Sequence, residues 1–378
     1  MKKPIPWWEP QISEEDISRV TDVLRSGSLG DSGAVRGFEK KVSGLLGCKH
    51  AVMAPSGTAA ITMGLLAAGV LGGDEVVVPD LTWVATANAA SIIGAKVVLC
   101  DIDPATLNLN PEQLGKVITP RTKAVLPVHV SGRACDMESI QQVASEHGVV
   151  VIEDAAEALM SKHKGRYLGT WGLAGAFSLS IFKLITAGQG GFIVTDDDAL
   201  HERLRELRNQ GLPRGGQNLL SRIGGFLGVG GSGSEEVFNS VGYNFKTTNI
   251  LGALAESQLK HLPLRMERIL RTLDIYRKNL PPEVRLFPFD IEGGELPLWI
   301  DAKTERRDEL IAYLASKHIE ARPLWLPLHR QKIYQGSDAD FPAATAAAPH
   351  SFWLPSAFTM SDEDALRVCR EINNFFGK

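Results

Sequence analysis

Two side chains that could do chemistry, Asp154 and Lys183, each follow a short apolar segment of the chain. Asp154 closely follows residues 149–152, a β-branched run typical of a fully buried strand in a parallel sheet. Lys183 follows apolar Ile181 and Phe182 and precedes a glycine cluster at 188–191. Open α/β sheets bind ligands at the carboxyl ends of such strands. An aspartate and a partly buried lysine in one pocket can serve pyridoxal 5′-phosphate (PLP), because the lysine forms a Schiff base and the aspartate partners the pyridinium nitrogen.

Both residues also have ordinary interpretations. Asp154 could be a strand-end carboxylate that caps a helix. Lys183 could be a solvated surface lysine, as most lysines are. The choice therefore depends on the rest of the chain.

The composition indicates a globular enzyme. The 378 residues are 44% hydrophobic and 22% charged, which allows two or three domains. A net charge of -4 argues against nucleic acid and anionic membranes as partners. The cysteines are far apart and form no Cys-x-x-Cys pair, so we expect neither a metal site nor disulfides. Without a signal peptide or a membrane-spanning stretch in the sequence, we expect a cytoplasmic protein.

Strand and helix patterns alternate through the first part of the chain. Strands are predicted at 51–54, 75–78, 96–100, 124–130, 149–152 and 192–195, and helices at 61–68, 82–93, 137–147 and 198–210. Two amphipathic helices precede them, one with capping-box spacing at Ser13 and Asp16 and one that ends at Gly47. This alternation predicts an α/β fold with a mostly parallel central sheet flanked by helices.

Small residues stand at the junction of the first strand and its helix. Ser56, Gly57 and Thr58 could bind a phosphate, because the first turn of a helix has free amides and a favourable dipole. A plain N-cap is the alternative. Trp83 follows the strand at 75–78, where it could stack on a planar ring or pack in a core or interface.

The glycine-rich segment at 213–234 is predicted to form a long loop. Its Arg222 could contact a diphosphate or could be a solvated charge. The glycines at 228, 230 and 233 match the dinucleotide pattern G-x-G-x-x-G. We reject a nicotinamide site, because no strand precedes the pattern and no helix follows it.

The C-terminal part of the chain is predicted to form a smaller α+β unit. Helices are predicted at 248–262, 263–280 and 307–317, strands at 296–300 and 321–326, and a last helix capped by Ser361 and Asp364. We therefore predict a large domain at residues 1–250 and a small C-terminal domain at 251–378.

In order and spacing, these motifs resemble the DegT/DnrJ/EryC1/StrS sugar aminotransferases, PLP enzymes of fold type I. The resemblance covers nearly the whole chain. It is carried by residues 55–60, 73–76, 151–158, 177–178, Lys183, 188–191, 242–246, 321–323 and 327–329.

The resemblance implies a role for each matching residue. Lys183 would be the Schiff-base lysine and later the base that moves a proton, and Asp154 would hold the pyridine nitrogen protonated. Glu157 would contact the 3′ oxygen of the cofactor, and Trp83 would stack on its ring. Ser56, Gly57, Thr58 and Ser178 would bind the phosphate. Asn244 would reach the phosphate of the neighbouring subunit's cofactor, which implies a homodimer with shared active sites. Arg222 and His329 are candidate substrate contacts.

Some positions depart from the usual family pattern. Residues 130–133, Val-Ser-Gly-Arg, replace a more usual Leu-Tyr-Gly-Gln, and Gln189 stands where glutamate is common. These departures lie where substrate is expected, so they bear on substrate identity more than on reaction type.

The resemblance implies an aminotransferase that moves an amino group from L-glutamate to a 4-keto or 3-keto deoxysugar carried by a nucleotide. The motif around Glu157 is similar to that of enzymes that make perosamine. A cyclitol aminotransferase remains open, as do a PLP-dependent sugar dehydratase and a non-catalytic PLP-binding protein of the same fold. Lys183 argues against the dehydratase, since such relatives carry histidine in its place.

Overall fold

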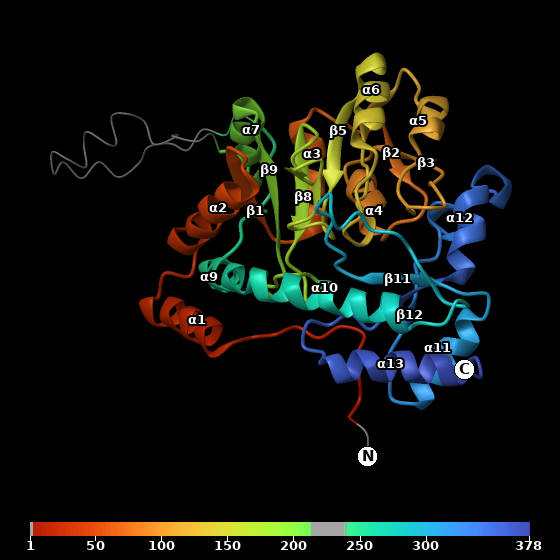
Figure 1. Ribbon diagram of the computed structural model, residues 1–378. Coiled ribbons are helices and arrows are strands. Elements are labelled where there is room, and N and C mark those ends of the chain that lie inside the picture. The colour runs from red at the N-terminus through yellow and green to blue at the C-terminus, as the bar shows by residue number, and fades with distance from the viewer. Residues whose placement is uncertain (1–2, 213–237, 239) are drawn as a thin grey trace, which may run out of the picture.

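A central sheet and a smaller second sheet form the core of the computed structural model, which describes residues 3–212, 238 and 240–378. Figure 1 shows the central sheet in the upper half, with helices on both sides, and the long helices α10 and α13 below it. Within the described residues, the central sheet has the strand order β1-β9-β8-β5-β4-β2-β3. Its strands are β1 (His50–Ala54), β2 (Glu75–Pro79), β3 (Lys96–Cys100), β4 (Thr122–Val125), β5 (Val150–Asp154), β8 (Ala174–Ser178) and β9 (Gly191–Thr195).

Strand β5 lies in the middle of this sheet and ends at Asp154. It pairs in parallel with β4 on one side and with β8 on the other. Strand β9 is antiparallel to both of its neighbours, β1 and β8. The predicted α/β fold with a mostly parallel sheet is therefore confirmed.

Helices pack on both faces of the sheet, because successive side chains of each strand point to opposite faces. Val76 and Val78 of β2 join a core with α3 (Gly57–Ala67), α4 (Ala85–Ser91) and α7 (Asp198–Arg208). Val77, between them, points to the opposite core, which includes α5 (Pro111–Val117) and α6 (Met137–His147). Helix α2 (Gly33–Leu46) packs Phe38 edge-on against Phe192 of β9.

The second sheet is antiparallel, in the order β10-β11-β13-β12. Its strands are β10 (Arg285–Leu286), β11 (Ile300–Lys303), β12 (Arg322–Pro323) and β13 (Ser351–Leu354). Helices α10 (Leu262–Asn279), α11 (Arg307–Ser316) and α13 (Asp362–Phe375) share a core with it. Ile5 joins this core and pairs with Ile319, so the start of the chain packs on the C-terminal part. The division into residues 1–250 and 251–378 stays a prediction.

The remaining elements are α1 (Glu14–Ser26), α9 (Asn249–Gln258), α12 (Pro342–Ala347) and the short pair β6 (Lys162–His163) and β7 (Arg166–Tyr167). Both predicted capping boxes are present: Ser13 caps α1 with Asp16, and Ser361 caps α13 with Asp364. The predicted helix at 82–93 is shorter in the structure, since α4 covers only Ala85–Ser91.

Three strand predictions were too long. Strand β4 ends at Val125 instead of residue 130, because Pro127 has no amide to donate and Val128 forms only an isolated bridge with Asp154. The strand predicted at 296–300 began too early: β11 starts at Ile300, because the Leu298 amide donates to the Ser131 carbonyl instead of to a neighbouring strand. The strand predicted at 321–326 is reduced to β12.

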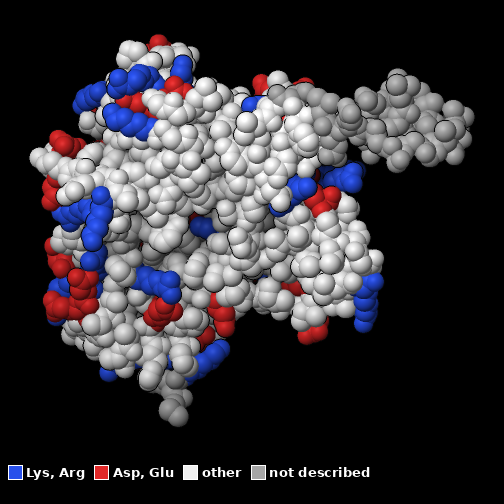
Figure 2. Space-filling model, turned by 180° about the vertical axis from the view of Figure 1, so that it is seen from behind, with Lys and Arg blue, Asp and Glu red and all other residues white. Residues whose placement is uncertain are grey.

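Charged side chains of both signs lie mainly along the edges of the visible back of the molecule, its middle is mostly uncharged, and a hollow lies near its centre (Figure 2). Among the helices of the described ranges, none combines the length and the apolar character needed to cross a membrane.

Candidate active site

A cavity of about 520 Å³ opens at the carboxyl end of β5, between the central sheet and the second sheet. It gathers residues that are far apart in the sequence. The predicted site residues that line it are Ser56, Gly57, Thr58, Trp83, Asp154, Glu157, Ser178 and Lys183.

Asp154 is the last residue of β5 and is almost fully buried. Its Oδ2 accepts a hydrogen bond from Thr86 Oγ1 at 2.7 Å, and its Oδ1 accepts one from the Ala156 amide at 3.1 Å. Burial raises the pKa of Asp154, while these hydrogen bonds and the nearby Lys183 charge act in the opposite direction. A cationic ligand in the cavity would favour the ionised carboxylate.

Lys183 lies in the loop between β8 and β9, and its side chain is 12% exposed. Its Nζ is 3.5 Å from Glu157 Oε1 and 4.5 Å from the centre of the Trp299 ring. The loop returns to the sheet through Gly190, whose φ of 130° is a conformation that other residues rarely adopt. The amine is thus held inside the cavity and does not point into water.

Glu157 is also buried, and its Oε2 accepts the Ser131 amide at 2.8 Å. Burial raises the pKa of Glu157 to about 7, although the Lys183 charge and the Ser131 hydrogen bond lower it. Near neutral pH this carboxyl group can therefore hold or release a proton.

The N-terminus of α3 forms one end of the cavity. The Ser56 hydroxyl caps the helix by accepting the Ala59 amide, and the amides of Gly57 and Thr58 belong to the first turn, which has no intrahelical partners. A side chain at Gly57 would lie 3.0 Å from Ser178 Cβ, a tight contact, so glycine is favoured where the helix approaches β8. Amides, hydroxyls and the helix dipole together suit a phosphate group.

Comparison with known proteins decides the family. The family model of the DegT/DnrJ/EryC1/StrS aminotransferase family matches residues 10–373. The chain belongs to this family. It is therefore a PLP-dependent sugar aminotransferase.

Individual relatives match over almost their full length. The chain is 32% identical to GDP-perosamine synthase of Escherichia coli O157:H7, with 99% of each chain covered. It is 36% identical to the spore coat polysaccharide biosynthesis protein SpsC of Bacillus subtilis (strain 168), covering 98% of this chain and 96% of that protein. Among solved structures, DesI in the presence of its TDP-sugar product has a TM-score of 0.87 at 30% identity, with 99% of this chain and 93% of that chain covered.

The residues of the cavity fit PLP. The buried carboxylate of Asp154 suits the protonated ring nitrogen, and the α3 N-terminus with Ser178 suits the phosphate. Trp83 is 60% exposed although it lines the cavity, which leaves a large aromatic face available for a planar ring. Among the described residues, no group of three or more His, Cys, Asp or Glu side chains could hold a metal ion.

An aromatic wall faces these residues across the cavity. It is formed by Trp7, Trp299, Trp325, Trp353 and Phe182, whose rings pack against one another. Sequence analysis assigned no role to these residues or to Arg322 and Thr86, which also line the cavity. For Arg322, its place in the motif at 321–323 was a signal that could have found it.

Two other predicted residues lie elsewhere. His329 is buried outside the cavity, with Nδ1 2.6 Å from Asp80 Oδ2 and Nε2 2.9 Å from Asp338 Oδ1. We therefore correct its assignment as a substrate contact: it ties the 3-10 turn at Leu328–Arg330 to the end of β2. Asn244 is exposed and does not line its own chain's cavity, and its role toward a neighbouring subunit stays a prediction. Arg222 lies outside the described residues.

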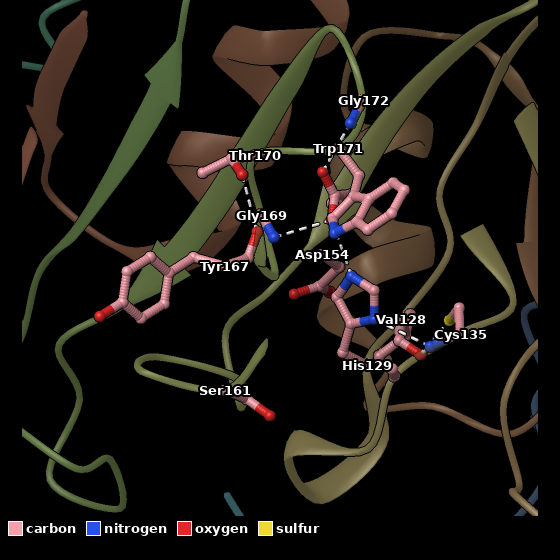
Figure 3. A network of polar contacts seen from close by, with 12 residues as sticks. Val128, His129, Cys135, Asp154, Ser161, Tyr167, Gly169, Thr170, Trp171 and Gly172 are labelled. Carbon is pink, nitrogen blue, oxygen red and sulfur yellow. Dashed lines mark hydrogen bonds and ion pairs between the residues drawn. The ribbon is translucent and has the colours of Figure 1, made fainter. Parts of the chain in front are cut away.

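A polar network fixes the end of β5 behind Asp154 (Figure 3). The neighbouring Glu153 is fully buried and accepts the amides of Gly169 and Gly172, each at 2.7 Å. It also bonds His129 Nε2 at 2.9 Å, while the Cys135 amide donates to His129 Nδ1. Because both oxygens of Glu153 and both ring nitrogens of His129 have partners, the end of the strand, with Asp154, is held in one position.

Proposed function

We propose that this enzyme transfers an amino group from L-glutamate to the ketone of a deoxysugar carried by a nucleotide. The observation that carries the proposal is that Lys183 and Asp154 line one cavity together with the α3 N-terminus. Relatives named as GDP-perosamine synthases and a structure that holds a TDP-sugar product support the nucleotide-linked acceptor.

Bound PLP supplies the electron sink for the exchange of the amino group. Residues of the chain bind and orient the cofactor and move the proton. Asp154 stabilises positive charge at the ring nitrogen, and the α3 N-terminus holds the phosphate so that the ring stays in one orientation. Lys183 Nζ would take a proton from the amino-bearing carbon of the donor and pass it to the cofactor in the first half of the cycle, and would move a proton the opposite way, to the carbon of the acceptor, in the second half.

The walls of the cavity suit both substrates. Arg322 lines the cavity with its side chain 43% exposed; its Nε and Nη2 bond Glu320 Oε1, and its Nη1 can bind a carboxylate of the amino donor. The aromatic wall (Trp7, Trp299, Trp325, Trp353 and Phe182) offers faces on which the apolar side of a sugar ring can pack.

We further propose that the active unit is a homodimer with shared active sites. Asn244 lies on the surface, where a second copy of the chain could present its own cavity to it. Because the donor and acceptor use one cavity in turn, ping-pong kinetics are expected.

The test is a panel of amino sugars. The PLP-loaded enzyme is mixed with 4-amino and 3-amino deoxysugars linked to GDP, TDP or UDP, and with an aminocyclitol, and the visible absorbance of the cofactor is followed. A spectral change with one nucleotide-linked amino sugar supports the proposal and identifies the nucleotide and ring position. A change with the aminocyclitol alone would refute the nucleotide-linked acceptor.

A further inference from the structure

The amine of Lys183 lies between a carboxylate and an indole ring. Glu157 Oε1 is 3.5 Å from Nζ on one side, and the centre of the Trp299 ring is 4.5 Å from it on the other. Glu157 and Trp299 are each 5% exposed, so water screens neither contact strongly. A carboxylate and the face of an indole ring both attract positive charge.

Ser131 connects both sides of this arrangement. Its amide donates to Glu157 Oε2 at 2.8 Å. Its carbonyl accepts the amide of Leu298, the residue before Trp299, at 2.8 Å. One fully buried residue therefore fixes the carboxylate and the backbone next to the indole.

The side chain of Ser131 is itself held by the second sheet. Its hydroxyl donates to Asp301 Oδ1 of β11 at 2.7 Å and accepts the Trp353 indole N–H of β13 at 3.3 Å. Arg133 neutralises Asp301 through a contact of 2.7 Å to Oδ2. The remaining Arg133 donors bond the carbonyls of Pro288 and Thr106. This network leaves the hydroxyl of Ser131 one orientation.

The backbone at Ser131 is correspondingly constrained. Its φ of 54° lies in the left-handed region, which is costly for residues other than glycine and Asn or Asp. Next to it, a side chain at Gly132 would meet the Leu296 carbonyl oxygen at 2.0 Å. The turn at residues 130–133, which departs from the usual family pattern, is thus locked against the second sheet.

We propose that Glu157 and Trp299 form a resting site for the amine of Lys183 whenever this amine is not joined to the cofactor, and that Ser131 is the positioning residue of that site. The site can hold one proton in either of two places. With the proton on Nζ, the pair is ammonium and carboxylate; with the proton on Oε1, it is neutral amine and carboxylic acid. The total charge is zero in both cases, so neither form places net charge in the buried cavity.

This inference rests on Lys183 as the reacting amine of the proposed function, but its test needs no turnover. In the apoprotein, trace acetic anhydride labels neutral amines, and mass spectrometry gives the labelling rate of Lys183 relative to exposed Lys123. At about pH 8, Glu157→Gln and Trp299→Leu are each expected to raise the relative rate about fivefold, since each removes one stabiliser of the cation.

Ser131→Ala is expected to raise the rate by about threefold, since it keeps the amide but frees the turn. The matched control is Ser351→Ala, which removes another fully buried hydroxyl, bonded to the Ala347 carbonyl, on the same sheet. Its rate is expected to equal that of the wild type. If Ser131→Ala does not fold, Ser131→Gly tests the same point, because it also removes the hydroxyl and adopts the left-handed backbone at this position without strain.

The pH dependence of the labelling rate distinguishes loss of the resting site from a general opening of the cavity. Opening raises the labelling rate at every pH, whereas loss of the resting site raises it at about pH 8 and not near pH 11, where amines are neutral in any case. Unchanged rates in both Glu157→Gln and Trp299→Leu would overturn the resting site. A raised rate in these two with a wild-type rate in Ser131→Ala or Ser131→Gly would overturn the role of Ser131. A protein that labels as expected but fails to transaminate would refute the proposed function alone.

Discussion

The Nζ atom of Lys183 lies 3.5 Å from Oε1 of Glu157, and both side chains are enclosed by the cavity. A carboxyl group at this position can titrate, whereas an amide of the same shape cannot. The pair therefore couples the protonation of the site to the pH of the medium.

Glu157 is expected to make the apoprotein less stable as the pH rises. Burial raises its pKa from 4.5 to about 7, so the folded chain binds its proton more tightly than the unfolded chain does. The resulting stabilisation is complete below about pH 4.5 and is lost as the pH rises through about 7, up to about 3 kcal/mol. Urea unfolding of wild type and Glu157→Gln at several pH values checks this: the gap in unfolding free energy should change over that interval. Parallel curves would contradict the raised pKa.

Lys183→Ala is expected to lower turnover by at least about a thousandfold and to remove the visible absorbance of bound PLP, because no other group supplies the reacting amine. Steady-state assays and an absorbance spectrum measure both effects. The melting temperature of the apoprotein serves as the control for folding. Retention of turnover and absorbance together would defeat the lysine assignment.

Local patterns were sufficient to predict the cofactor side of the cavity. The apolar run before Asp154 predicts a buried strand, and Ser56 to Thr58 predict the start of a helix. Both predictions need only residues that are close together in the sequence. Lys183 needed the family resemblance, since a lysine in a loop has no pattern of its own. The structure places all of these around one cavity.

The substrate side could not be predicted in the same way. Trp7, Trp299 and Trp353 come from three distant segments and meet only because the start of the chain packs on the second sheet. His329 was assigned to substrate from a motif, but its environment depends on Asp80, which lies far away in the sequence. Contacts of this kind are tertiary and leave no periodic signal.

Substitution of Asp154 is expected to lower kcat more than substitution of Thr86. Asp154→Asn removes the charge that partners the ring nitrogen, so kcat should fall about a hundredfold or more. Thr86→Val removes the donor to Oδ2 of Asp154 and the partner of the Thr82 hydroxyl, and should cost about tenfold. Steady-state kinetics rank the two variants, with circular dichroism as the control for the fold. A larger loss in Thr86→Val than in Asp154→Asn would contradict the assigned roles.

Asn244→Ala is expected to weaken PLP binding about tenfold in a dimer with shared sites, because an amide donor to the phosphate is lost. Fluorescence titration of the apoprotein with PLP measures the affinity, and light scattering measures the oligomeric state. Asn209→Ala is the control, since Asn209 pairs with Asn244 through the backbone alone. Sustained turnover by an isolated monomer would refute shared sites.

His329→Ala is expected to destabilise the protein without changing its choice of acceptor. The side chain is buried between Asp80 and Asp338, and its removal leaves the Asp80 carboxyl group buried without its imidazole partner. A loss of about 3 kcal/mol in the free energy of unfolding follows from such an uncompensated group. Asp338→Asn, on the exposed side of the same imidazole, should cost much less. Urea unfolding measures both variants, and the ratio of kcat/KM between two acceptors should stay at the wild-type value. A changed ratio with unchanged stability would restore His329 as a substrate contact, against its position in the structure.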